Sequence, residues 1–271
     1  MSKKKVAPIK TIYYHDELND DFSATKEILD ERKIDERYNY FRLRNFFVRL
    51  WANFLYYIIA KPIIWLVLKI YFRFKVVNKK AMKKRGKNGC FIYGNHTNYL
   101  PDAAFNSLLH HKRNYVIVGS QTVNIKGIGK LVQDLGAIPL GSTLKAKANF
   151  MECISSKLKE NASITIYPEA HIWPYYTKVR PFLKDSFAYP VEYDVPVYAV
   201  ATCYQKRKHA LRPRIIFVVC GPFYKDASLS KPDAMQKLRD EVYAALYNAT
   251  NKYSNYEYYK YIKSDKPENE Q

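Results

Sequence analysis

The sequence contains no Gly-x-Ser-x-Gly elbow, the usual signature of a serine hydrolase of the α/β class. Its cysteines are few and far apart, without the paired spacing of a zinc site or the density of a disulfide framework, and they are Cys90, Cys153, Cys203 and Cys220. The basic start at residues 1–5 is not followed by the apolar run of a secretory signal. These absences predict reduced thiols and a cytoplasmic setting.

Acidic residues are also scarce. The 271 residues include 25 Asp and Glu against 45 Lys and Arg, a formal net charge of +20. Such an excess predicts an anionic partner: nucleic acid, an acidic membrane surface or an acidic carrier protein. The 25 tyrosines suit a bilayer interface and suit base stacking equally well. Because the basic residues gather beside an apolar segment and form no recognised nucleic-acid motif, we expect no nucleic-acid partner.

No apolar run reaches the roughly 20 residues that span a bilayer. Two shorter runs, 51–60 and 63–68, are separated by Lys61-Pro62 and flanked by basic residues on both sides. Proline interrupts helices, and basic residues at both ends disfavour a true span. We therefore predict two short helices lying in one leaflet, within a membrane-associated segment at residues 39–77. The alternative is a soluble helical pair packed on the rest of the chain.

Beyond residue 77, apolar strands alternate with helices. Strands are predicted at 90–93, 115–119, 163–167, 195–201 and 214–219, and helices at 103–109, 128–135, 144–158 and 234–247. Several strands are apolar throughout, which predicts an α/β fold with a mixed, mostly parallel sheet covered by helices. We expect a polar extension at 1–38, one domain at 78–250, and a polar, Tyr-rich tail at 251–271 that is frayed or lies on the surface.

One connection between a strand and a helix brings an imidazole and a carboxylate together. His96 follows the strand at 90–93, and Asp102 stands in the first turn of a helix predicted to have Pro101 at its first position. An Asp bonded to Nδ1 of a His fixes the tautomer and stabilises the imidazolium that forms when the other nitrogen takes a proton. The pair therefore predicts a general base, although an Asp is also simply favourable in a first helical turn.

A second carboxylate ends another strand. Glu169 follows Pro168 after the strand at 163–167, and open α/β sheets place their ligands at the carboxyl ends of strands. Because His96 also ends a strand, we expect the two side chains to face one crevice.

In order and type, these segments resemble the glycerolipid acyltransferase family, typified by bacterial 1-acylglycerol-3-phosphate acyltransferase. The resemblance covers roughly residues 76–220, and a two-helix membrane segment precedes it as in bacterial members. Family members carry Asn-His with four spacers before Asp, a glycine-bounded helix, a Phe/Tyr-Pro-Glu-Gly-Thr-Arg block, and an apolar strand with an early Pro. The matching segments here are 94–102, 127–139, 167–172 and 195–200.

The chain departs from the family in spacing and in charge. Five residues separate His96 from Asp102, which changes the register of the loop between them. The family's two arginines that grip the acceptor's phosphate are replaced by Gly141-Ser142 and Ile172. Either other cations substitute for them, the candidates being Lys145, Lys147, Lys178 and Arg180, or the acceptor is a different lyso-lipid or a lipid-linked alcohol.

The resemblance implies a membrane-associated O-acyltransferase that moves a fatty acyl group from a thioester to the hydroxyl of a lysophospholipid, 1-acylglycerol-3-phosphate or a related acceptor, in phospholipid biosynthesis. His96 would be the base and Asp102 its orienting partner, while Glu169 would bind acceptor hydroxyls or hold the loop that carries His96. Backbone N–H groups near Asn98 are candidate oxyanion donors. The substrate-binding candidates are Glu169, Asn95, Asn98, Lys145, Lys178 and Arg180.

No metal or cofactor is expected, and the acyl donor would be an acyl carrier protein or coenzyme A thioester. The expected partners are an anionic phospholipid membrane, an acyl carrier protein and the lyso-lipid substrate. The expected location is the cytoplasmic face of the cell membrane, in a peripheral or monotopic arrangement. The competing hypothesis is a non-catalytic lipid-binding module at the membrane surface, which would tolerate loss of His96.

Overall fold

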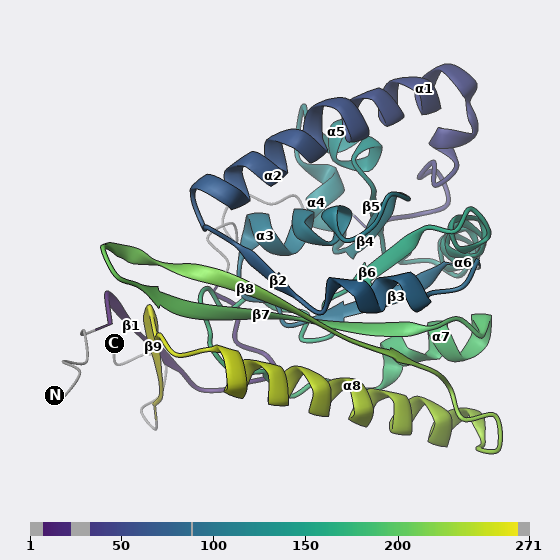
Figure 1. The fold of residues 1–271 in the computed structure, drawn as a ribbon. Helices are drawn as coiled ribbons and strands as arrows, with labels where there is room; N and C mark the ends of the chain where they lie inside the picture. Colours follow the sequence, from purple (N-terminus) through teal and green to yellow (C-terminus); the bar gives the residue numbers. More distant parts are fainter. Residues whose placement is uncertain (1–7, 23–32, 88, 265–271) are drawn as a thin grey trace, which may run out of the picture.

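A seven-stranded sheet forms the centre of the computed structural model, which describes residues 8–22, 33–87 and 89–264 (Figure 1). The strands are β1 (Lys10–Tyr14), β2 (Lys75–Val77), β3 (Cys90–Gly94), β4 (Asn114–Val118), β5 (Ala137–Pro139), β6 (Ser163–Ile166), β7 (Val197–Arg207), β8 (Ala210–Phe223) and β9 (Tyr259–Lys263). The α-helices are α1 (Phe46–Phe54), α2 (Lys61–Ile70), α3 (Tyr99–Ala104), α4 (Ser120–Asn124), α5 (Gly129–Asp134), α6 (Leu144–Lys159), α7 (Ala188–Tyr193) and α8 (Lys231–Tyr253). The remaining helical elements are a π-helix and four 3₁₀-helices. The π-helix is η2 (Leu55–Ala60), and the 3₁₀-helices are η1 (Arg42–Arg44), η3 (Lys79–Lys84), η4 (Phe105–Leu108) and η5 (Asp185–Phe187).

The strand order in the sheet is β2-β8-β7-β3-β6-β4-β5. Strands β7, β3, β6, β4 and β5 run parallel to one another, β8 is antiparallel to β7, and β2 is parallel to β8. This confirms the predicted mixed, mostly parallel sheet. Because β3 and β6 are neighbours, their carboxyl ends bring the segments after Gly94 and Ile166 to the same edge of the sheet.

Both faces of the sheet are covered, which explains the uniformly apolar strands. In β3, Phe91 and Tyr93 join the core formed with α6, α7 and α8, while Cys90 and Ile92 join the core formed with α2, η3 and the α3–η4 segment. All four side chains are fully buried. Successive strand residues therefore anchor the sheet to opposite helical layers; in Figure 1, α7 and α8 lie below the sheet and α2 and α3 above it.

The two helices predicted around Lys61-Pro62 are present as α1 and α2, but the π-helix η2 joins them into one continuous helical run. A proline ring clashes with the carbonyl four residues earlier in an α-helix. Here the N–H of Lys61 donates to the carbonyl of Tyr56, five residues back, so the turn before Pro62 is wider than an α-turn. The proline is thus accommodated, and the expected break does not form.

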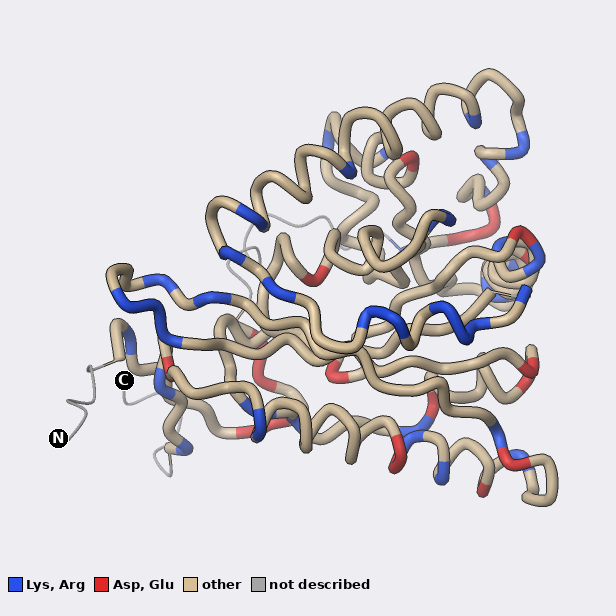
Figure 2. Tube along the Cα trace, viewed as in Figure 1, with Lys and Arg blue, Asp and Glu red and all other residues tan. Residues whose placement is uncertain are grey.

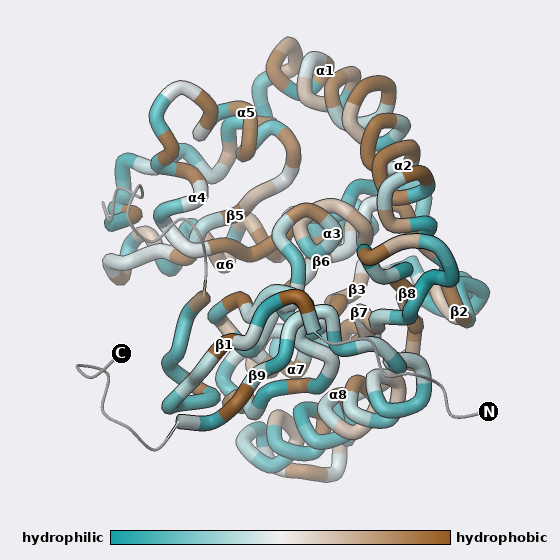
Figure 3. Tube along the Cα trace, turned by 90° about the vertical axis from the view of Figure 1, so that its left-hand side faces the viewer, coloured by the Kyte–Doolittle hydropathy of each residue, from teal (hydrophilic) through white to brown (hydrophobic). Residues whose placement is uncertain are grey.

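The continuous run, Phe46–Ile70, has 25 residues and a mean hydropathy of 1.5 in its most apolar window, of which 11% is buried. By length and composition it is sufficient to cross a membrane, in contrast to the two separate runs read from the sequence. Its outward side carries large exposed apolar side chains: Phe46, Phe47, Leu50, Trp51, Phe54, Ile58, Ile63, Trp65, Leu66 and Ile70. Figure 3 shows that α1 and α2 consist largely of hydrophobic residues and lie at the periphery of the molecule.

The segments at the two ends of the described chain pair with each other. Strands β1 and β9 form a parallel two-stranded sheet, with Ile12 opposite Tyr261. The sequence predicted a polar extension and a frayed or surface-lying tail, and it gave no sign of this pairing. Other elements differ from their predicted bounds. Helix α3 begins at Tyr99, so Pro101 is its third residue rather than its first. Strands β7 and β8 are longer than predicted and form a long hairpin.

Candidate active site

The loop after β3 is fixed to the neighbouring strand β7 by Asn95. This side chain is fully buried; its Oδ1 accepts a hydrogen bond from the Thr202 N–H at 2.7 Å, and its Nδ2 donates to the Thr202 carbonyl at 3.0 Å. Both polar ends of the amide are therefore used within the protein. Asn95, expected to bind substrate, instead sets the position from which His96 projects.

His96 and Asp102 meet as predicted despite the longer spacing. His96 Nδ1 lies 2.9 Å from Asp102 Oδ2, and Asp102 is 1% exposed. The same oxygen accepts the N–H groups of Thr97 at 2.7 Å and Asn98 at 2.8 Å. The added residue is absorbed because the loop folds around this one carboxylate oxygen. The N–H of Asn98 is consequently engaged with Asp102 and is not an oxyanion donor.

The imidazole is accessible on its other side. The His96 side chain is 24% exposed, and no residue of the described chain is hydrogen-bonded to its Nε2. With Nδ1 bonded to a buried carboxylate, Nε2 is the nitrogen that can take a proton from a bound molecule.

Tyr167, which begins the segment 167–172 and has no role predicted from the sequence, supports both members of the pair. Its ring stacks on the His96 ring with centroids 4.7 Å apart and planes at 22°. Its hydroxyl donates to the main-chain carbonyl of Asp102 at 2.6 Å. The only available signal was its position at the end of β6, directly before Pro168-Glu169.

Glu169 holds the His96 loop, one of the two roles that the family resemblance left open. Its Oε2 accepts the main-chain N–H of His96 at 2.9 Å, and its Oε1 accepts the N–H of Arg180 at 2.8 Å. The carboxylate is fully buried. Burial raises the pKa of Glu169, and the nearby Arg180 opposes that rise. Both carboxylate oxygens are thus used by the protein itself.

Arg180 is a correction to the list of acceptor-binding candidates. It is fully buried, its guanidinium lies 3.5 Å from Glu169 Oε2, and it donates to the carbonyls of Glu17 and His171. It is therefore a partner of Glu169 within the fold, without the exposure that a substrate phosphate requires. Lys145, in the first turn of α6, and Lys178, between β6 and α7, are both exposed.

The segment after Glu169 also forms main-chain hydrogen bonds to the loop that carries His96. The N–H of Trp173 donates to the His96 carbonyl at 3.1 Å, and the N–H of Tyr175 donates to the Thr97 carbonyl at 2.8 Å. The Trp173 ring is stacked against Tyr261 of β9, with centroids 4.9 Å apart. The sequence pattern did not reveal Trp173, because its partners lie far away along the chain.

A cavity of about 630 Å³ lies at the carboxyl ends of the parallel strands β4, β5 and β6, and its wall includes Tyr167 but neither His96 nor Asp102. Tyr167 and Glu169 form one part of its wall, and Leu140, Leu183 and Tyr189 contribute apolar surface to it. A ligand in this cavity would lie against the side of Tyr167, whose ring covers His96. Among the described residues, no group of three or more His, Cys, Asp or Glu side chains is arranged to hold a metal ion.

Comparison with known proteins adds two findings. Residues 73–202 match a family model described as Acyltransferase, and this range contains His96, Asp102 and Glu169. Among solved structures, the chain is similar to the 1-acyl-sn-glycerophosphate (LPA) acyltransferase PlsC from Thermotoga maritima, with a TM-score of 0.50 and 16% identity over 80% of this chain and 92% of that one. At this identity the likeness is one of fold. No curated protein matches the chain by sequence.

Proposed function

We propose that the chain, whose residues 73–202 match the Acyltransferase family model, is a glycerolipid acyltransferase that transfers a fatty acyl group from a thioester to the hydroxyl of a lysophospholipid at a membrane surface. The observation that carries the proposal is the 2.9 Å contact between His96 Nδ1 and Asp102 Oδ2. This contact orients an accessible imidazole so that it can act as a base. The imidazole lies at the edge of the sheet where open α/β folds bind ligands.

In the proposed reaction, His96 Nε2 removes the proton from the acceptor hydroxyl as its oxygen attacks the thioester carbonyl carbon. The C–S bond breaks, the leaving thiolate takes the proton back from His96, and an ester remains on the acceptor. Asp102 orients the ring and stabilises the imidazolium, a contribution of about 10²–10⁴-fold in rate for general-base catalysis. Three hydrogen bonds to Oδ2 keep this carboxylate in place.

The cavity beside Tyr167 is our candidate for the acyl chain. It is large enough for part of a lipid chain, and apolar side chains such as Leu140 and Leu183 line it next to the His96–Tyr167 stack. We propose a 1-acylglycerol-3-phosphate or a related lyso-lipid as the acceptor, because the similar Thermotoga maritima structure is an LPA acyltransferase. With Arg180 buried, Lys145, Lys147 and Lys178 are the remaining cations from the predicted set, and all three are exposed.

We also propose membrane association through the exposed apolar side of α1 and α2, helped by basic residues near both ends of the helix. At the α2 end, Arg212 stacks on Tyr71 at 3.9 Å and Arg207 donates to the Tyr71 carbonyl, so the β7–β8 hairpin carries positive charge to that end. Figure 2 shows Lys and Arg along this hairpin. Each such residue near an anionic surface contributes about 1 kcal/mol. We place the domain on the cytoplasmic face, with an acyl carrier protein or coenzyme A thioester as donor.

The test is transfer of a labelled acyl group from acyl carrier protein to lysophosphatidic acid on anionic vesicles. We expect His96→Ala to abolish transfer while the protein remains folded. His209→Ala removes an exposed histidine from the β7–β8 hairpin and is the matched control. If His96→Ala retains full transfer, the mechanism is wrong. If folded wild-type protein binds vesicles but acylates no lyso-lipid from either donor, the non-catalytic lipid-binding module is the better account.

A further inference from the structure

A second pocket, of about 550 Å³, opens at the opposite edge of the sheet from His96. Arg85 precedes β3, Asn161 precedes β6, and His110-His111 precede β4, so the pocket lies at the amino ends of these parallel strands. The five residues of β3 separate the two edges by roughly 16 Å at strand spacing. The pocket is thus distinct from the candidate active site, and nothing in the proposed reaction uses it.

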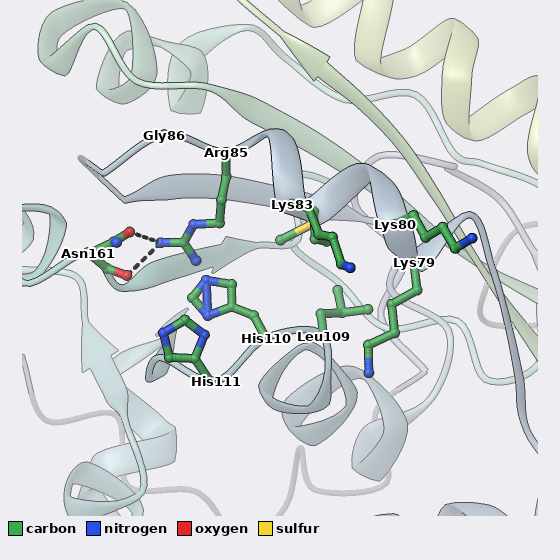
Figure 4. Close-up of a pocket in the computed structure, with 10 residues that line it drawn as sticks. Lys79, Lys80, Lys83, Arg85, Gly86, Leu109, His110, His111 and Asn161 are labelled. Carbon is green, nitrogen blue, oxygen red and sulfur yellow. Dashed lines mark hydrogen bonds between the residues drawn. The ribbon is translucent and has the colours of Figure 1, made fainter.

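The pocket is lined by cations without a carboxylate among them. Its charged and titratable lining residues are Lys79, Lys80, Lys83, Arg85, His110 and His111. Figure 2 shows the run of basic residues along the segment between β2 and β3 that supplies four of these side chains. In Figure 4, Arg85 reaches toward the two histidines and Lys83 toward Leu109, whereas Lys80 points away. Such a concentration of positive charge is costly unless an anion is bound.

Arg85 carries buried N–H donors that the described part of the protein leaves unpaired. The residue is only 5% exposed, and its Nη2 donates to the carbonyl and the side-chain oxygen of Asn161. Its Nε and Nη1 are buried without a hydrogen-bond partner in the described part of the chain. Figure 4 shows one side of the guanidinium turned to Asn161 and the other turned to His110 in the pocket.

The two buried arginines, Arg85 and Arg180, differ in whether a carboxylate lies beside them. Arg180, also buried, has the carboxylate of Glu169 beside it, whereas no carboxylate of the described residues forms an ion pair with Arg85. A buried guanidinium without an anion is unfavourable, and burial lowers the pKa of Arg85 accordingly. Two unused N–H donors and a set of surrounding ammonium groups fit an oxyanion with several acceptor oxygens.

We propose that this pocket binds a phosphate monoester group. The apolar side chains of Met82 and Leu109 at its wall would contact the part of the ligand that carries the phosphate. The pocket is physically tied to the apolar helix, because Lys61 at the start of α2 donates to the His110 carbonyl at 3.0 Å. A phosphate monoester group can belong to a lipid headgroup at the membrane or to a soluble phosphate. The experiment distinguishes these two kinds of ligand.

Binding is measured on the full-length protein with two probes. Equilibrium dialysis with labelled inorganic phosphate tests the soluble source. Flotation with phosphatidic acid vesicles, compared with phosphatidylglycerol vesicles of matched surface charge, tests the headgroup. The variants are Arg85→Gln and Lys83→Met, and the control is Lys252→Met, an exposed cation on α8 on the other side of the sheet.

We expect saturable binding of at least one probe that weakens about tenfold in Arg85→Gln and about three- to fivefold in Lys83→Met, with no change in Lys252→Met. Binding of phosphate identifies a soluble ligand, and a preference for phosphatidic acid alone identifies a headgroup. Lys83 is a surface-facing cation of η3, so Lys83→Met tests the site even if Arg85→Gln fails to fold. No saturable binding, or equal binding by the Lys83→Met and control proteins, overturns the proposal. Neither readout depends on acyl transfer.

Discussion

The main-chain N–H of His96 donates a hydrogen bond of 2.9 Å to Oε2 of Glu169. The catalytic candidate is therefore held by a residue from the end of the neighbouring strand, through its backbone rather than its ring. This leaves the imidazole free to pair with Asp102. The acidic residue of the Tyr-Pro-Glu segment is thus a positioning residue for the base.

Asp102→Asn tests the orienting role directly. An asparagine oxygen can still accept the N–H groups of Thr97 and Asn98, so we expect the fold to persist. An amide cannot stabilise the imidazolium, and the rate of acyl transfer should fall about 10²–10⁴-fold. The measurement is the turnover rate together with circular dichroism. A variant with wild-type turnover would show that His96 works without Asp102.

Glu169→Gln should lower stability and turnover together. The carboxylate accepts two main-chain N–H groups, and a glutamine amide replaces one acceptor oxygen by a donor. Leaving a buried N–H unpaired costs about 1–3 kcal/mol. Urea denaturation measures the free energy of unfolding, and Asp185→Asn, an exposed carboxylate at the same cavity, is the control. Equal stability of the two variants would contradict the anchoring role.

The pH dependence of stability provides a separate test of the same residue. Because burial raises the native-state pKa of Glu169 above its ordinary value of 4.5, the unfolded chain loses this proton first. Its contribution to stability therefore falls as the pH rises from about 4.5 through the raised pKa. We expect the difference in unfolding free energy between wild type and Glu169→Gln to shrink across this window. A difference that grows with pH would show that the carboxylate is stabilised as the anion.

Tyr167→Phe separates the ring of this residue from its hydroxyl. The phenylalanine keeps the stack on His96 but loses the hydrogen bond to the Asp102 carbonyl. We expect a loss of about 0.5–1.5 kcal/mol in unfolding free energy with most of the turnover retained. Tyr167→Ala, which removes the stack as well, should reduce turnover severely. If the two variants are equally active, the stacking contact does not position the imidazole.

The exposed side of α1 and α2 predicts a graded loss of membrane binding. Phe47 is 77% exposed and Ile58 is 63% exposed, and burying such a side chain in lipid stabilises binding by about 1.5–3 kcal/mol. Phe47→Glu and Ile58→Glu should each weaken vesicle binding by about 10- to 100-fold. Tyr247→Glu on α8, across the sheet, should leave binding unchanged. Vesicle co-sedimentation measures the effect, and unchanged binding in all three variants would exclude this face.

The central sheet and the contact between His96 and Asp102 were predictable because both depend on local patterns. Apolar runs such as Cys90–Gly94 fill both faces of a covered strand, and His96 with Asp102 occupies one short connection. The role of Arg180 was not predictable, because a sequence does not show which arginine is buried beside a carboxylate. The continuous helix was missed because the wide turn before Pro62 depends on backbone adjustment. The pairing of β1 with β9 is too distant and too short to leave a pattern.

That pairing means that the site is completed only after β9 has been synthesised. Tyr14 of β1 and Tyr261 of β9 both contact the ring of Trp173, and the N–H of Trp173 donates to the His96 carbonyl. The two strands lie about 250 residues apart, so at about 5–20 residues per second β1 waits roughly 12–50 seconds for its partner to be translated. The sheet and the apolar helix have left the ribosome before then. The nascent chain therefore has time to reach a membrane before the support beneath His96 is assembled.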